Sequence, residues 1–265
     1  MHGPRRIVCL TEEPTEVLYA LGAQDRIVGI SGFTVRPPRA RREKPRVSAF
    51  TRARLDAILA LEPDLAIGFS DIQAGIAHDL VKAGIEVWIS NHRSVDGILD
   101  YVRRLGALVG EAAAAAAYAT RLAGHLEAVR TAGAALLRHP RVYFEEWDEP
   151  IIVAIQWVAE LLRSAGGEDV FPELSTQSLA KHRIIADARE VVRRDPQIIF
   201  GSWCGKRFRP EQVAARPGWG AISAVRTRQL FEIKSPIILQ PGPAALFDGL
   251  DALHAHIRAW ALRRD

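Results

Sequence analysis

The chain lacks several features that would place it in a familiar class at once. Among its 265 residues it has two cysteines, Cys9 and Cys204, one in each half. A disulfide between them would lock the two halves together, so we predict two free thiols. No run of about 20 apolar residues is present, which argues against a membrane-spanning helix.

Catalytic and metal-binding signatures are also scarce. No Walker loop, dinucleotide-binding fingerprint or Ser-His-Asp arrangement stands out. The eight histidines lack the spacing of paired metal ligands, except His254 and His256, whose side chains would diverge on a helix. The sequence thus indicates neither a metal site nor an enzyme. Cys204 beside Lys206 and Arg207 leaves a catalytic thiol open, because neighbouring cations lower the pKa of a thiol.

The composition suits a globular protein with two cores. Hydrophobic residues make up 48% of the chain, which is ample for two domains of ordinary size. The net charge is +4, and the one local basic run extends from Arg36 to Arg46. Prolines interrupt this run and no aromatic residues are interleaved with it. It therefore indicates a surface loop, and we expect no nucleic-acid partner.

One long helix is predicted near the middle of the chain. The stretch from Gly110 to Pro140 contains six consecutive alanines, followed by apolar residues at helical spacing. At about 1.5 Å per residue such a helix would extend roughly 40 Å. Its single apolar stripe lacks the sustained charge pairing of a coiled coil. We therefore interpret it as a strut between two lobes.

The segments on either side of this helix follow a common plan. Arg6–Pro14 and Arg141–Pro150 each indicate a strand followed by acidic residues and then a helix. Leu55–Ser70 and Ala188–Trp203 each indicate a helix, a turn with an acidic residue and proline, and a buried strand. The repeated plan predicts two lobes of similar construction.

Strands that alternate with helices imply a mainly parallel sheet flanked by helices. The sequence therefore predicts an α/β fold with two lobes, residues 1–105 and 140–265, and a bridging helix within 106–139. In the first lobe, Ser31–Ala49 is predicted to be a loop and Thr51–Leu61 a helix.

A resemblance to a known family rests on seven segments. They are RIVCLTEEPTEVLYALGAQDRIVGIS, LDAILALEPDLAIG and LVKAGIEVWI in the first half, and RVYFEEW, WVAELLRSAGGEDVF, DPQIIFGSW and LFEIKSP in the second. These segments resemble the helical-backbone (class III) substrate-binding proteins of ABC transporters, which carry cobalamin, ferric siderophores or haem. The resemblance covers nearly the whole chain and is greatest to the cobalamin-binding branch.

The resemblance implies a monomeric binding protein, without a covalent cofactor, that holds cobalamin or a related corrinoid in a cleft between the lobes. It also implies delivery of that ligand to an ABC permease. A siderophore or haem is the alternative ligand. Because Met1 is followed closely by Arg5 and the first strand, the sequence as given shows no signal peptide. We expect a periplasmic protein if a signal was removed, and otherwise a cytoplasmic corrinoid or metal carrier or an enzyme.

Two acidic doublets, Glu12-Glu13 and Glu145-Glu146, follow the first strand of each lobe. Ligands of parallel sheets bind at the carboxyl ends of the strands, where these residues are expected. One of each pair could cap the next helix, which in the first lobe is predicted at Glu16–Leu21. Alternatively, the carboxylates accept hydrogen bonds from the primary amides of a corrin ring.

Aromatic and basic residues are expected at the same strand ends. Phe69 and Trp88 could instead belong to the core, and Lys206 is expected on the rim of the second lobe. His92 and His182 could reach the cleft as axial cobalt ligands or remain ordinary surface histidines. The aromatic candidates for holding a large planar ligand are Phe33, Phe69, Trp88, Trp147 and Trp203.

The resemblance also implies a docking surface for the permease. In the cobalamin-binding branch, one surface glutamate on each lobe pairs with permease arginines. Leu230–Pro236 resembles the segment that carries the second of these, which makes Glu232 the candidate. The corresponding first-lobe segment, Phe69–Gly75, lacks a matching glutamate, and Asp71 is its nearest acid. Glu232 could equally be an ordinary solvated residue.

Overall fold

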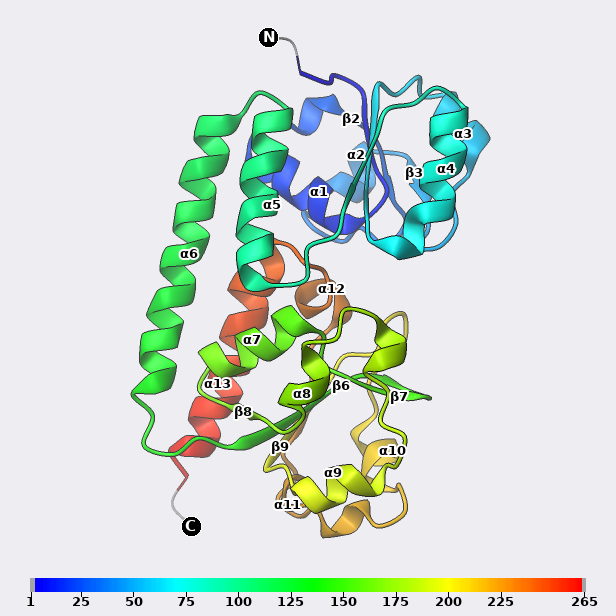
Figure 1. Ribbon diagram of the computed structural model, residues 1–265. Helices are drawn as coiled ribbons and strands as arrows, with labels where there is room; N and C mark the ends of the chain where they lie inside the picture. The colour runs from blue at the N-terminus through cyan, green and yellow to red at the C-terminus, as the bar shows by residue number, and fades with distance from the viewer. Residues whose placement is uncertain (1–2, 264–265) are drawn as a thin grey trace. The chain divides into compact units, whose positions relative to one another are not determined.

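The computed structural model describes residues 3–263 (Figure 1). This part of the chain packs into two compact units. The first takes the chain up to His92, Asp96–Ala123 and Gln240–Pro243. The second takes Arg93–Val95, Gly124–Leu239 and the chain from Ala244 onward.

The first unit is built on a five-stranded sheet with the order β3-β2-β1-β4-β5, and every strand pair in it is parallel. All residues of β1 and β4 are buried, as expected of a parallel sheet covered by helices on both faces. The strands are β1 (Ile7–Cys9), β2 (Ile27–Ser31), β3 (Arg46–Ser48), β4 (Leu65–Phe69) and β5 (Val87–Ser90).

The helices of the first unit alternate with these strands, as the sequence predicted. They are α1 (Glu12–Ala20), α2 (Ala40–Glu43), α3 (Leu55–Leu59), α4 (Ala74–Lys82) and α5 (Val95–Leu108), with 3₁₀ turns at Gln24–Arg26 and Asp71–Gln73.

Two local predictions in the first unit are wrong. Ser31–Ala49, predicted to be a loop, contains α2 and β3. The Ile30 amide donates to the Pro45 carbonyl at 2.9 Å, so the edge of β2 finds a partner strand despite the nearby prolines. The helix predicted over Thr51–Leu61 is also too long, since α3 begins at Leu55. The preceding residues stay extended because Ala53 forms a β-bridge with Ser48.

The second unit has a mixed sheet with the order β10-β9-β6-β7, and β8 pairs with β6. The β6–β9, β9–β10 and β6–β8 pairs are parallel, whereas β6–β7 is antiparallel. The β6–β7 pair is antiparallel because only two residues link these strands, whereas a parallel pair needs a long crossover connection. The strands are β6 (Arg141–Asp148), β7 (Ile151–Val153), β8 (Glu168–Asp169), β9 (Ile198–Gly201) and β10 (Leu230–Glu232).

Helices flank this sheet, and a buried cluster that includes Tyr143, Phe171, Ile199 and Trp219 forms one of its cores. The mainly parallel α/β class predicted from the sequence is therefore confirmed. The helices of the second unit are α7 (Gln156–Ser164), α8 (Pro172–Ser175), α9 (Arg189–Arg194), α10 (Pro210–Ala214), α11 (Ser223–Arg226), α12 (Ser235–Ile238) and α13 (Leu250–Ala261), together with a 3₁₀ turn at Ala180–His182, another at Trp219–Ala221 and a π-helical turn at Ala245–Gly249.

The predicted long helix is α6 (Ala112–Ala134), drawn in green in Figure 1, and both units contribute to it. Its 23 residues correspond to about 35 Å. Small residues allow its close packing. A Cβ on Gly106 of α5 would lie 2.0 Å from the Ala115 Cβ, and one on Gly133 would lie 2.6 Å from the Ser164 carbonyl oxygen. Among residues 3–263, no helix is both long and apolar enough to cross a membrane.

Candidate functional site

The acidic doublet of the first unit lies in the first turn of α1. The helix predicted at Glu16–Leu21 begins earlier than expected, at Glu12, with Thr11 at its N-cap position. Glu12 is 7% exposed and Glu13 is 1% exposed. The Thr11 hydroxyl donates to Glu13 Oε1 at 2.6 Å, while Glu13 Oε2 is buried without a hydrogen-bond partner.

Burial raises the pKa of both carboxyl groups, since charged groups are disfavoured away from water. The pKa of Glu12 rises to about 8, with neighbouring Glu13 and Glu16 adding to the effect of burial. The pKa of Glu13 rises to about 7, although its hydrogen bond from Thr11 opposes the shift. Near neutral pH these groups therefore hold protons part of the time, and can donate as well as accept hydrogen bonds.

His92 is held by its neighbours in the first unit. One ring nitrogen, Nδ1, lies 2.7 Å from Ser90 Oγ, and the other, Nε2, lies 2.8 Å from the Pro241 carbonyl oxygen. The ring also stacks on Tyr101 at 4.7 Å. Because both nitrogens are engaged, coordination of cobalt by His92 would require one of these contacts to break.

The three aromatic candidates of the first unit differ in exposure. Phe69 is 4% exposed and packs edge-on against His92 at 5.3 Å. Trp88 is half-buried and stacks on Tyr101, also at 5.3 Å. Phe33 is 48% exposed. Of the three, Phe33 therefore has the most surface available for a ligand.

Glu145 lies inside β6 and not after it, contrary to the prediction, because the strand continues to Asp148. Its side chain is completely buried and fully engaged. Its oxygens accept hydrogen bonds from the Tyr143 hydroxyl at 2.8 Å and from Trp203 Nε1 at 3.1 Å. The Arg216 guanidinium donates to both oxygens, at 2.5 and 2.9 Å. The carboxylate therefore has little capacity left for a ligand. It orients Trp203 instead, which makes it a positioning residue.

Glu146 is likewise paired. It accepts hydrogen bonds from Arg183 at 2.5 and 3.3 Å, and Arg183 is 1% exposed. Arg183 also donates to the Val153 carbonyl of β7 at 2.5 Å. Arg183 therefore connects β6 to β7 and to the segment after the 3₁₀ turn Ala180–His182. Sequence reasoning missed Arg183 and Arg216, because both lie in irregular segments with no motif around them.

Two indoles and an ammonium form an aromatic–cationic face, which we define as Trp147, Trp203 and Lys206. Trp203 is only 3% exposed, so Trp147 and Lys206 supply most of the surface of this face. Lys206 Nζ lies 4.3 Å from the centre of the Trp147 ring and 5.1 Å from that of Trp203. The ammonium also pairs with Asp148. Trp147 donates from Nε1 to the Glu149 carbonyl at 2.8 Å, which fixes its ring. The contacts hold the three side chains in one arrangement before any ligand binds.

A cavity of about 680 Å³ adjoins this face in the second unit. Its volume lies within the range typical of small-molecule sites. Glu232, predicted to dock a permease, lies on its wall, and its Oε1 accepts a hydrogen bond from the Phe208 amide at 3.1 Å. The lining residues are Trp203, Gly205, Lys206, Arg207, Glu232, Lys234, Ser235 and Pro236.

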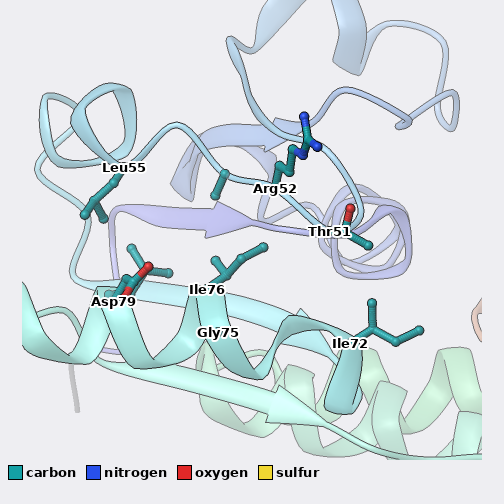
Figure 2. Close-up of a pocket in the computed structure, with 9 residues that line it drawn as sticks. Thr51, Arg52, Leu55, Ile72, Gly75, Ile76 and Asp79 are labelled. Atoms are coloured by element: carbon teal, nitrogen blue, oxygen red, sulfur yellow. The ribbon is translucent and has the colours of Figure 1, made fainter.

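A second cavity, of about 440 Å³, lies in the first unit between the segment 51–55 and α4 (Figure 2). Ile72 and Ile76 point from the α4 side toward that segment, as Figure 2 shows. Ile72 is 49% exposed and belongs to Phe69–Gly75, the segment compared above with a permease-docking surface. None of the predicted ligand-binding residues lines this cavity. Asp71 is exposed nearby in sequence but does not line it either.

Possible metal ligands are not clustered in the described part of the chain, and the two thiols differ in exposure. No group of three His, Cys, Asp or Glu residues there is placed to hold a metal ion. Cys9 and Cys204 are free thiols, as predicted. Cys9 is buried, and burial raises its pKa to about 12, so it stays protonated. Cys204 is exposed.

Residues 7–237 match the model of a family described as periplasmic binding protein. The match covers most of the chain, so the chain belongs to the periplasmic binding protein family. This confirms the family predicted from the sequence, which is one of substrate-binding proteins rather than enzymes.

Individual relatives agree with this assignment. The chain is 26% identical over 202 residues to a cobalamin-binding protein of Halobacterium salinarum, covering 74% of this chain and 53% of that protein. It therefore spans about half the length of that relative. It is 25% identical over 248 residues to a vitamin B12-binding protein of Vibrio vulnificus, covering 91% of this chain and 86% of the relative. Its fold is similar to that of the periplasmic vitamin B12 binding protein BtuF of Vibrio cholerae, with a TM-score of 0.77 and 24% identity over the whole of both chains.

Proposed function

We propose that this protein binds cobalamin or a related corrinoid and delivers it to an ABC importer, acting as a periplasmic monomer. The observation that carries the proposal is the aromatic–cationic face of the second unit, which is held in place by buried ion pairs. The relatives from Halobacterium salinarum and Vibrio vulnificus, described as binding cobalamin and vitamin B12, support the choice of ligand.

The candidate residues of each unit, taken separately, have chemistry that suits a corrinoid. The corrin ring has large apolar faces, which aromatic side chains such as Trp147 and Phe33 can cover. Its rim carries primary amides, whose carbonyls accept hydrogen bonds and whose N–H groups donate them. Lys206 is a donor, and Glu12 and Glu13 can act as either because their pKa values lie near neutrality. Binding therefore needs neither a covalent bond nor a cofactor of the protein's own.

Within this proposal the residues have two roles. Glu145, held by Arg216, positions Trp203 by accepting its hydrogen bond, and Glu146, held by Arg183, precedes Trp147 in β6. The direct ligand contacts are proposed from each unit separately. They are Glu12, Glu13, Phe33, Phe69 and Trp88 in the first, and Trp147, Trp203 and Lys206 in the second.

Calorimetric titration with cyanocobalamin tests the ligand. We expect saturable binding, and a loss of about tenfold in affinity for Trp147→Ala, since a large aromatic contact is worth about 1.5 kcal/mol or more. Trp260→Ala is the matched control, because Trp260 is similarly half-buried but lies on α13, away from the face. No heat at high micromolar ligand would remove the corrinoid proposal.

Delivery is tested with vesicles that carry the cognate permease. Glu232 and Asp71 are the proposed docking acids, and Glu232→Lys should reduce uptake. Its affinity for cyanocobalamin should stay the same or rise, since Glu232 also lies on the cavity wall. Undiminished uptake would show that this surface does not dock. Cell fractionation tests the location of the protein. A cytosolic pool would favour a cytoplasmic corrinoid or metal carrier over a periplasmic protein that serves an importer.

A second candidate ligand is an anionic metal chelate, such as haem or a ferric siderophore. The observation that favours it is the cavity of the second unit, whose wall includes Lys206, Arg207 and Lys234. Titration with haem and with a ferric siderophore, beside cyanocobalamin, decides between the candidates by which one binds tightest.

A further inference from the structure

The cavity of the second unit continues the aromatic–cationic face. Trp203 and Lys206 belong to both, since they line the cavity and lie beside Trp147. A ligand seated on the face therefore has an open volume of about 680 Å³ next to one edge. That volume is well above what a single small substituent fills, so it suits a larger appendage.

The cavity wall is basic. It carries Lys206, Arg207 and Lys234 against one acid, Glu232. Lys206 is paired with Asp148, which lies outside the wall. Among residues 3–263, neither Arg207 nor Lys234 forms an ion pair, and both are exposed. Two cations without a protein partner face a cavity, and an anionic group is the partner that such an arrangement recognises.

The charges also favour one kind of anion. A guanidinium matches the geometry of phosphate oxygens with two parallel hydrogen bonds, and an ammonium adds a compact charge. Glu232 introduces a negative charge into the same wall, which disfavours a doubly charged group. A singly charged phosphate diester fits these conditions better than a doubly charged monoester.

We propose, on the basis of the proposed function, that this cavity binds the phosphodiester of a complete corrinoid through Arg207 and Lys234. Cobalamin carries such a group in the nucleotide loop attached to the edge of its corrin ring. Cobinamide has the same ring without the loop. The cavity therefore makes the protein selective for complete corrinoids, and the aromatic–cationic face binds the ring that both share.

The test compares cyanocobalamin with dicyanocobinamide. Both are neutral overall; dicyanocobinamide lacks the nucleotide loop and has a second cyanide on cobalt in place of the base of that loop. Affinity is measured by calorimetry or by quenching of tryptophan fluorescence. The variant is the double substitution Arg207→Gln and Lys234→Gln. Its matched control, Lys181→Gln with Arg258→Gln, removes one lysine and one arginine that are exposed in the same unit but do not line the cavity.

We expect the wild type to bind cyanocobalamin more tightly than dicyanocobinamide. An exposed ion pair contributes up to about fivefold in affinity, so the double variant should lose up to about 25-fold for cyanocobalamin. Its affinity for dicyanocobinamide should not change, and the control should match the wild type for both. Higher salt should weaken cyanocobalamin binding selectively in the wild type.

Other outcomes overturn the inference in distinguishable ways. Equal affinity of the wild type for both corrinoids would overturn the phosphodiester site and leave corrinoid binding intact. A loss of the same size for both ligands in the double variant would show that these cations contact the ring. Failure of both corrinoids to bind would overturn the proposed function as well. Tight haem binding that depends on Arg207 and Lys234 would then show that the cavity binds the carboxylates of haem.

Discussion

Removal of the Glu145 carboxylate by Glu145→Ala should destabilise the second unit severely. The carboxylate is fully buried and joins three side chains, Tyr143, Trp203 and Arg216. Its loss leaves the Arg216 guanidinium, whose side chain is 18% exposed, without its ion-pair partner. It also leaves the Tyr143 hydroxyl and Trp203 Nε1 without the acceptor that they share.

The magnitude follows from these contacts. Breaking a buried ion pair by removing one partner costs about 3–5 kcal/mol. Each buried donor left without an acceptor costs about 1–3 kcal/mol, though the terms overlap and relaxation reduces their sum. We expect a loss of about 4 kcal/mol, a large part of the 5–15 kcal/mol that typically stabilises a domain.

The assay is urea unfolding followed by tryptophan fluorescence, because Trp203 and Trp219 report on the second unit. Glu149→Ala is the control, since Glu149 is exposed and its contact with Trp147 runs through the backbone carbonyl. It should change the free energy of unfolding by less than about 0.5 kcal/mol. Glu145→Gln should fall between the two. If Glu145→Ala lowers the free energy of unfolding by less than about 1 kcal/mol, the hydrogen bonds and ion pair of Glu145 do not stabilise the second unit as argued.

Two further predictions concern stability. Because the pKa values of Glu12 and Glu13 are raised from 4.5 to about 8 and about 7, their contribution to stability is fully present below pH 4.5 and is lost as the pH rises through these values. The free energy of unfolding should therefore be lower at pH 8 than at pH 5 by a few kcal/mol on account of these two groups. Glu12→Gln should reduce this difference. The same difference in the wild type and in Glu12→Gln would contradict the assignment. In α6, Gly133→Ala should destabilise by about 1–3 kcal/mol, because its Cβ would lie 2.6 Å from the Ser164 carbonyl oxygen. Gly124→Ala is its control and should stabilise by up to about 1 kcal/mol, since nothing lies within 4 Å of the added Cβ. The urea midpoints of the two variants should shift in opposite directions, and a shift in the same direction would refute the packing argument.

Local sequence patterns determined the class of fold and the order of most elements. The buried strands β1 and β4 were evident from short apolar runs, and α6 from its alanines and helical spacing. These signals are local, because the periodicity of apolar residues sets which face of an element is buried. The edge strand β3 escaped detection because its pairing with β2 depends on a neighbouring strand and not on its own composition.

The sequence indicated candidate site residues but not the contacts that they make. The acidic doublets and the tryptophans were selected because they were predicted to follow buried strands, but Glu145, Glu146 and Trp147 lie within β6. Only the tertiary structure decided what each carboxylate does. Arg183 lies 37 positions from Glu146, and Arg216 lies 71 positions from Glu145. No local pattern connects such residues, since their pairing arises only when β6 and the later segments pack together and exclude water. The sequence predicted acids at the strand ends, whereas packing paired Glu145 and Glu146 with particular arginines inside β6.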